Sequence, residues 1–188
     1  HPMRCHCGAD PGVPTGYSDT FDTLDPGWSL PAFNTDYTMG VSGGRFELTR
    51  NIENIFGGIS FGFARRQHVP APTEVVIQCD MFSNIDTGSM FIFWDYNISL
   101  GRFFYSCGIQ YSPGLGGIGW YRHDGIFRNF ALPFGDRDRH TAWLRVVDVG
   151  GGQAKSEFCM DGVIVATHTD TYTFLPYRYC GVGAEPDV

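Results

Sequence analysis

Short segments in which apolar and polar residues alternate, separated by glycine-rich turns, run through most of this chain. In residues 74–82, EVVIQCDMF, the side chains of Val75, Ile77, Cys79 and Met81 fall on one side. A period of two places successive side chains on opposite faces of a β-strand, so this segment is a predicted strand. GVSGG, SPGLGG, DVGGG and MDG lie between such segments, and their glycines supply the positive φ angles of tight turns. The pattern predicts an all-β fold.

Glycine and proline also argue against a helical fold, because together they occupy 36 of the 188 positions. No segment is long, glycine-free and helically periodic enough to predict a helix. Residues 1–17, HPMRCHCGADPGVPTGY, show no period, so we expect an irregular N-terminal arm followed by one domain over 18–188. Further strands are predicted at residues 45–49, 59–64, 89–96, 102–111, 117–122, 127–132, 142–148, 156–160, 163–169 and 178–184.

The charge balance limits the partners of the chain. Thirteen lysines and arginines against twenty aspartates and glutamates give a net charge of −7, which leaves no positive excess for a nucleic-acid backbone. No apolar stretch reaches the roughly 18 residues of a membrane helix, so we expect no membrane insertion. The six cysteines, an even number, favour an extracellular or cell-surface location.

Two segments carry a family resemblance. Residues 19–48, DTFDTLDPGWSLPAFNTDYTMGVSGGRFEL, combine an acidic and aromatic start, a tryptophan, a glycine turn and a short strand. Residues 140–169, HTAWLRVVDVGGGQAKSEFCMDGVIVATHT, contain a tryptophan-led strand and a second strand that ends in Asp161-Gly162. Both resemble concanavalin A-like, laminin-G-like jelly-roll domains, which implies a two-sheet jelly-roll sandwich. Such domains include lectins, glycan-binding and adhesion modules, glycoside hydrolases and polysaccharide lyases, so function must be argued from a site.

Aromatic residues make up 15% of the chain and gather in MFIFWDYN, RFFYSCGIQY and GIGWYRHDGIFRNF. Aromatic ring faces stack on the apolar C–H groups of sugars. Strand alternation places Met90, Ile92, Trp94 and Tyr96 opposite Phe91, Phe93 and Asp95. Either both faces are covered by protein, or one is a ligand platform or an assembly interface. The candidate glycan-binding residues are Trp94, Asp95, Arg102, Tyr105, Trp120, Tyr121 and Arg122.

The resemblance also implies a structural calcium ion and a disulfide. In many jelly rolls of this kind calcium ties the start of the domain to its last strand, and the candidate ligands are Asp19, Asp22, Asp25 and Asp187, or Glu185 in place of Asp187. Acidic turns also occur without metal. The return of the last strand beside an early one implies a Cys79–Cys180 disulfide, with two buried free thiols as the alternative.

Motifs for catalysis are weaker. The Glu-x-Asp-x-x-Glu pattern of laminarinase-like hydrolases is absent, and Asp80 with Asp95 is a candidate acid pair or two solvated side chains. A lyase could draw on Arg102, Tyr105, Gln110, Tyr121, Arg122 and His123. We therefore expect a non-catalytic, extracellular carbohydrate-recognition module. The alternatives are a structural protein whose arm and aromatic face dock on neighbouring copies in a homo-oligomer, and a glycoside hydrolase or polysaccharide lyase.

Overall fold

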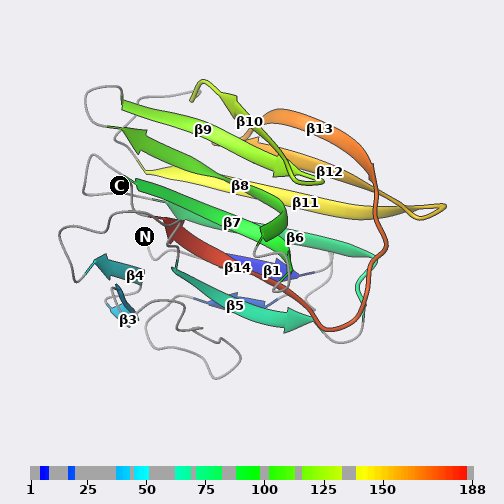
Figure 1. Cartoon of the computed structure of the whole chain (residues 1–188), viewed down its shortest axis with the longest axis horizontal. Coiled ribbons are helices and arrows are strands. Elements are labelled where there is room, and N and C mark those ends of the chain that lie inside the picture. Colours follow the sequence, from blue (N-terminus) through cyan, green and yellow to red (C-terminus); the bar gives the residue numbers. More distant parts are fainter. Residues whose placement is uncertain are drawn as a thin grey trace.

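In the computed structural model the strands form two six-stranded sheets stacked as a sandwich, with a separate two-stranded sheet (Figure 1). Residues 71–81, 88–96, 103–111, 117–132 and 139–183 are described with their side chains, and the other strands are described by their backbone course. Among the described residues, no helix has the length and apolar character to cross a membrane.

Sheet A contains β1 (Cys5–Gly8), β2 (Tyr17–Asp19), β6 (Glu74–Met81), β11 (His140–Gly150), β12 (Gln153–Met160) and β13 (Val163–Thr171). Its strand order is β13-β12-β11-β6-β1-β2. Sheet B contains β5 (Gly62–His68), β7 (Gly88–Asn97), β8 (Arg102–Ser112), β9 (Gly116–His123), β10 (Ile126–Phe130) and β14 (Arg178–Glu185). Its order is β10-β9-β8-β7-β14-β5, and β3 (Tyr37–Ser42) pairs with β4 (Arg45–Arg50). Every pairing is antiparallel.

The predicted all-β sandwich is confirmed, and most predicted strands agree with the observed ones to within a few residues. The expectation of an irregular arm over residues 1–17 is wrong for part of that segment, because β1 pairs with both β2 and β6. β1 has only four residues, CHCG, and β2 has three. Strands this short show no detectable alternation, so their pairing comes from the neighbouring strand β6.

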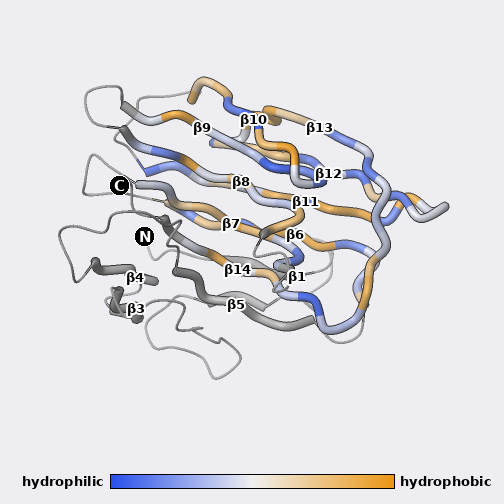
Figure 2. Tube along the Cα trace, in the orientation of Figure 1, coloured by the Kyte–Doolittle hydropathy of each residue, from blue (hydrophilic) through white to orange (hydrophobic). Residues whose placement is uncertain are grey.

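The main core lies between the two sheets. β6 and β11 are paired so that Ile77 lies beside Leu144, and both side chains are fully buried. Sheet B contributes its own inward-facing row, including Ile92 and Ile109. Apolar residues accordingly follow the central strands of both sheets, whereas polar residues are frequent toward the strand ends (Figure 2). The turn at Asp161-Gly162 has φ angles of 52° and 80°, and a type I′ hairpin turn requires positive φ at both of its central residues.

Candidate functional site

The β9–β10 hairpin presents different side chains on its two faces. Its turn is Asp124-Gly125, with φ angles of 43° and 73°, and antiparallel pairing brings Phe127 opposite Arg122. Trp120, Arg122 and Phe127 share the outer face of sheet B, because the Phe127 ring contacts both of the other side chains. Tyr121 is on the opposite face, where it stacks on Phe158 of sheet A. The hairpin therefore has one face toward the core and one away from it.

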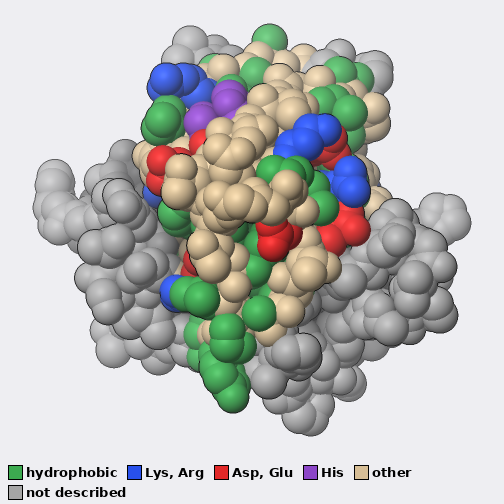
Figure 3. Space-filling view, turned by 90° about the vertical axis from the view of Figure 1, so that its right-hand side faces the viewer, with side chains coloured by type: hydrophobic (Ala, Val, Ile, Leu, Met, Phe, Trp, Pro, Cys, Tyr) green, Lys and Arg blue, Asp and Glu red, His purple; other side chains and the backbone are tan. Residues whose placement is uncertain are grey.

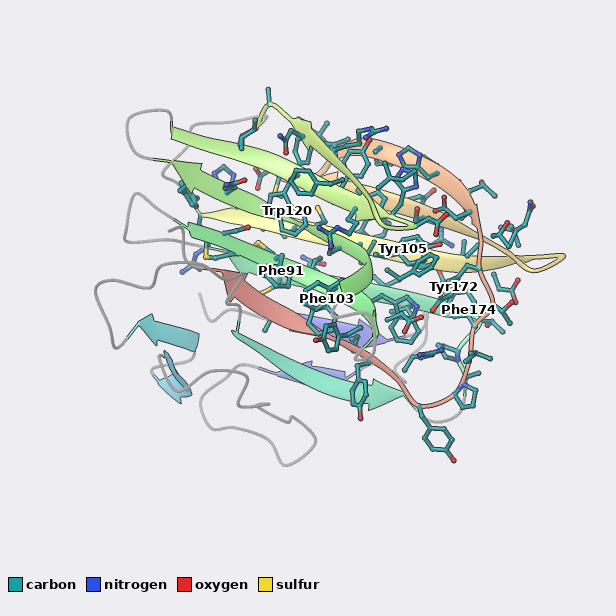
Figure 4. The ribbon with its side chains drawn as sticks, in the orientation of Figure 1. Phe91, Phe103, Tyr105, Trp120, Tyr172 and Phe174 are labelled. Atoms are coloured by element: carbon teal, nitrogen blue, oxygen red, sulfur yellow. The ribbon has the colours of Figure 1, made fainter. Side chains whose placement is uncertain are left out.

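A second apolar cluster covers the outer face of sheet B. Phe91 lies 5.0 Å from Phe103 and 5.7 Å from Trp120 between ring centroids. Phe93 and Tyr96 complete the cluster, and all five side chains are buried. Figure 4 shows Trp120, Phe91 and Phe103 next to one another across the sheet. Of the two arrangements that the sequence left open for residues 90–96, the burial of these side chains supports the one in which both faces of β7 are covered.

Phe127 extends this cluster to the surface. Phe127 is 40% exposed, and its ring centroid lies 5.4 Å from that of the buried Trp120. The Arg122 guanidinium carbon is 5.9 Å from the Phe127 ring centroid, within cation–π range. Asn129 is exposed and pairs in register with Trp120. We call Trp120, Arg122, Phe127 and Asn129 the Phe127 surface.

Trp120 and Gly119 hold the hairpin in place. The Trp120 indole Nε1 donates a hydrogen bond of 2.8 Å to Ser89 Oγ of β7, which fixes the ring beneath Phe127. On the inner face, a Cβ at Gly119 would collide with the Phe130 ring. Glycine at this position thus allows β10 to pack closely on β9.

A buried polar network lies at the end of the sandwich where β13 leads into β14. Trp94 Nε1 donates to the Tyr172 hydroxyl at 2.8 Å, and this hydroxyl donates to Asp95 Oδ2 at 2.9 Å. Arg178 Nη1 lies 3.4 Å from Asp95 Oδ1. Burial raises the pKa of Asp95, and it also raises the pKa of Tyr172, as does the nearby Asp95 carboxylate. Asp95 is held as a structural group between β7 and the 172–178 connection.

The main-chain geometry of Asp95 changes the faces that alternation predicts. Asp95 has a positive φ of 56°, a left-handed conformation uncommon outside glycine, asparagine and aspartate. Beyond it, Tyr96 joins Phe93 and Phe103 on the outer face instead of following Trp94 inward. The predicted grouping of Tyr96 with Trp94 is therefore wrong, whereas Ile92 and Trp94 do share the inner face.

A histidine cluster lies on the inner face of the same hairpin. The imidazole rings of His123 and His168 are stacked with 3.6 Å between centroids and 8° between planes. His123 Nδ1 is 3.0 Å from Asp170 Oδ1, and His168 Nε2 is 3.3 Å from the Tyr121 hydroxyl. The Tyr105 hydroxyl belongs to the same region, because burial and the charge of Asp170 both raise its pKa.

The predicted glycan-binding residues are thus divided among different environments. The exposure expected of Trp94 and Tyr105 is contradicted, because both side chains are fully buried in the main core. Trp120 is also buried, in the outer cluster, and only its neighbour Phe127 reaches the surface. Asp95 is in the buried network, Tyr121 faces inward, and Arg122 is on the outer face beside Phe127. The side chain of Arg102 lies outside the described residues.

The predicted cysteine pairing is wrong. Cys79 carries a buried thiol that is not in a disulfide, as do Cys107 and Cys159. Cys180 is disulfide-bonded, but not to any of these three. Cys79 lies on β6 of sheet A and Cys180 on β14 of sheet B, and the two strands belong to opposite layers of the sandwich. The last strand returns beside β7 and β5, not beside β6.

The predicted calcium ligands cannot be placed from the described side chains. Asp22, Asp25 and Asp187 lie outside the described residues, as do the side chains of Asp19 and Glu185. Within the described part of the chain, no three His, Cys, Asp or Glu residues are grouped so that they could hold a metal ion. The calcium site stays a prediction.

Asp80 and Asp95 are not a facing acid pair. Asp80 is next to the last residue of β6, where Thr141 Oγ1 donates to it at 2.7 Å. Asp95 lies seven residues after Gly88, the first residue of β7, a distance of about 23 Å along an extended strand. The two carboxylates have separate partners in different sheets, and no contact joins them among the described residues.

Comparison with known proteins gives a structural likeness alone. No family model matches the chain, and no curated protein matches it. Among solved structures, the metal-free carbohydrate recognition domain of Emp46p superposes with a TM-score of 0.58 and 14% identity, covering 90% of this chain and 87% of that one. The potassium-bound form of that domain superposes with a TM-score of 0.56 at 14% identity, covering 90% of this chain and 88% of that one.

A module from a phage protein is similar over nearly the whole chain. The CBM2 module of the evolved Dit protein of Lactobacillus casei BL23 phage J-1 gives a TM-score of 0.51 at 12% identity, over 99% of this chain and 90% of that one. The fold is a concanavalin A-like jelly roll. This confirms the fold that the sequence resemblance implied, and identities this low carry no further conclusion about the site.

Several residues of these clusters were not among the sequence predictions. Phe127 lies in the aromatic segment GIGWYRHDGIFRNF, and its place opposite Arg122 across an Asp-Gly turn was the available signal. His168, Asp170 and Tyr172 had no such signal. They follow His123 by more than forty positions, and only the stacking of the two sheets brings them near β9 and β7.

Proposed function

We propose that this chain is a carbohydrate-binding module that holds a glycan against the Phe127 surface. The solved structures that share its fold at TM-scores of 0.51 to 0.58 include the carbohydrate recognition domain of Emp46p and a CBM2 module. The fold alone leaves the site open, so the proposal depends on the side chains of the β9–β10 hairpin.

The exposed ring of Phe127, supported by a buried aromatic cluster, is the observation that carries the proposal. Phe127 is 40% exposed, so its ring can stack on the C–H face of a sugar, and the ring packs against Trp120. Arg122 lies beside the ring and Asn129 is exposed on the same face. Their N–H groups and the Asn129 carbonyl would bond sugar hydroxyls.

The proposal includes three features beyond the binding surface. The module acts outside the cell or at the cell surface, a location that the disulfide-bonded Cys180 favours. A calcium ion held by the acidic residues at the start of the domain and near its last strand has a structural role. The glycan is the principal partner, and assembly with further copies through the N-terminal segment is the alternative.

The central experiment separates binding from catalysis. The purified chain is applied to immobilised cellulose, β-1,3-glucan, galactan, mannan and polygalacturonate, while the same soluble polymers are assayed for new reducing ends and for unsaturated products. We expect retention on at least one polymer without product. Retention with product formation would establish an enzyme, and the absence of retention on every polymer would favour the assembly role.

A further inference from the structure

The stacked imidazoles of His123 and His168 join the two sheets at one end of the sandwich. His123 is the last residue of β9 in sheet B, and His168 is in β13 of sheet A. The 3.6 Å between ring centroids is a direct contact, and Asp170 and Tyr121 extend it on either side through distances of 3.0 and 3.3 Å. In the end view, histidine side chains gather at the upper part of the face, beside basic side chains (Figure 3).

This contact lies directly behind the Phe127 surface. Alternation along β9 sends Trp120 and Arg122 outward, and Tyr121 and His123 inward. β10 is the edge strand of sheet B, so its one strand partner is β9. The position of the hairpin relative to sheet A therefore depends on contacts of its inner face with β12 and β13.

The charges around the pair can balance one added proton but not two. Asp170 of β13 faces His123, with 3.0 Å between its Oδ1 and His123 Nδ1. Tyr121 of β9 contacts His168, Tyr105 of β8 lies near Asp170, and the neighbouring side chains from β12 are the neutral Phe158 and Ser156. Arg128 of β10 adds a positive charge that acts on His168. A second imidazolium would lie 3.6 Å from the first, and the carboxylate that acts on His168 is Asp170, which already lies against His123.

We propose that the His123–His168 pair is a pH-sensitive latch, which holds the β9–β10 hairpin against β13 at neutral pH and releases it on acidification. Like charges at such short range repel strongly in a partly buried site. We also expect the Phe127 surface to bind glycan more weakly at acid pH, and this consequence rests on the proposed function. The opening of the hairpin does not depend on it.

The direction of the pH effect follows from His168. Burial lowers its pKa below the ordinary 6.5, and the charges of His123 and Arg128 lower it further, while Asp170 partly offsets them. An unfolded or open chain thus binds this proton more readily than the closed one. The stability that the closed pair contributes is complete above pH 6.5, and it is lost as the pH falls from there through the lowered pKa.

Hydrogen exchange of the full chain without glycan tests the latch. Amides of residues 117–130 are compared with those of β11 and β12 at pH 7.5 and pH 5.0, after correction for the intrinsic exchange rate. In the wild type we expect hairpin exchange to rise by about threefold or more relative to β11 and β12 on acidification. His168→Phe keeps a flat ring but takes no proton, so the ratio of hairpin exchange to exchange in β11 and β12 should be the same at both pH values. Thr169→Val, an exposed position on the same strand, should behave as the wild type.

Two results would overturn the latch. The first is a wild-type exchange ratio that is the same at pH 7.5 and pH 5.0. The second is a rise of this ratio on acidification in His168→Phe that equals the rise in the wild type. Glycan retention at pH 7.5 and 5.0 is measured in parallel. If no polymer is bound while the exchange ratio rises, the latch stands and the proposed function fails. If retention is found but the ratio stays constant, the proposed function stands and the latch fails.

Discussion

The Trp94 indole donates a hydrogen bond of 2.8 Å to the Tyr172 hydroxyl, which in turn donates to Asp95 at 2.9 Å. Trp94 is in β7 of sheet B, and Tyr172 directly follows β13 of sheet A. One hydroxyl thus satisfies a buried donor and a buried acceptor, and it fixes the connection that leads from sheet A into β14. Figure 4 shows Tyr172 beside Tyr105 and Phe174 at this end of the sandwich.

Tyr172→Phe should destabilise the fold. It leaves the buried Trp94 N–H without an acceptor and removes a donor from Asp95, so we expect the free energy of unfolding to fall by about 1–3 kcal/mol. Urea unfolding followed by tryptophan fluorescence measures it. Thr173→Ala, at the exposed neighbouring position, should stay within about 0.5 kcal/mol of the wild type. Equal stability of Tyr172→Phe and the wild type would show that this network does not support the fold.

Asp95→Asn should gain stability relative to the wild type as the pH rises. Burial raises the pKa of Asp95 in the folded state, although Tyr172 and Arg178 partly offset it. The stability that the Asp95 carboxyl group contributes is complete below its unfolded-state pKa of about 3.9, and it is lost as the pH rises through the folded-state pKa. Asparagine also tolerates the positive φ of 56°. Urea unfolding of both proteins at pH 4, 5.5 and 7 tests the prediction. A difference in the free energy of unfolding between Asp95→Asn and the wild type that is constant with pH would contradict it.

The three described cysteines that are not in a disulfide should remain unmodified until the chain unfolds. Cys79, Cys107 and Cys159 are buried thiols, and burial raises the pKa of Cys107 and of Cys159, which disfavours the reactive thiolate. Without reductant, we expect iodoacetamide to label all three in denaturant and none of them under native conditions. Mass mapping that finds Cys79 unlabelled after unfolding would instead support the Cys79–Cys180 disulfide that the structure contradicts.

Removal of calcium should lower the melting temperature if the predicted acidic site is formed. An ion that binds only the native state stabilises it by mass action, by about 2.7 kcal/mol at a hundred times its dissociation constant. Calorimetry with excess EGTA, and again after calcium is restored, measures the shift. Asp22→Asn should abolish the response to calcium. An identical melting curve with and without chelator would show that calcium does not stabilise the native state, which would contradict the predicted site.

Alternation predicted the strands well wherever a strand is long and has one face in a core. β6 and β11 were found in this way, because their inward rows around Ile77 and Leu144 are unbroken. β1 and β2 were missed, because segments of four and three residues are too short to show a period. The left-handed Asp95 was also invisible to a pattern that assumes extended backbone, so Tyr96 was placed on the wrong face.

The site was less predictable than the fold, because alternation separates two faces without saying what covers each. Trp94 and Tyr105 were expected at the surface and lie in the main core, whereas the exposed aromatic side chains among the described residues are Phe127 and Tyr177. The contact of His123 with His168 depends on the stacking of two sheets whose strands are distant in sequence. Local sequence contains no signal for such a contact.

The most direct test of glycan binding at the Phe127 surface compares two adjacent residues. Phe127 and Ile126 are both 40% exposed, but Phe127 contacts Trp120 on the outer face, whereas Ile126 pairs with His123 and lies on the other face. Isothermal titration with the polymer that the wild type retains best measures both alanine variants. We predict that Phe127→Ala weakens binding at least about tenfold, or 1.4 kcal/mol, and that Ile126→Ala changes it less than about twofold. Wild-type affinity in Phe127→Ala would contradict the proposed site.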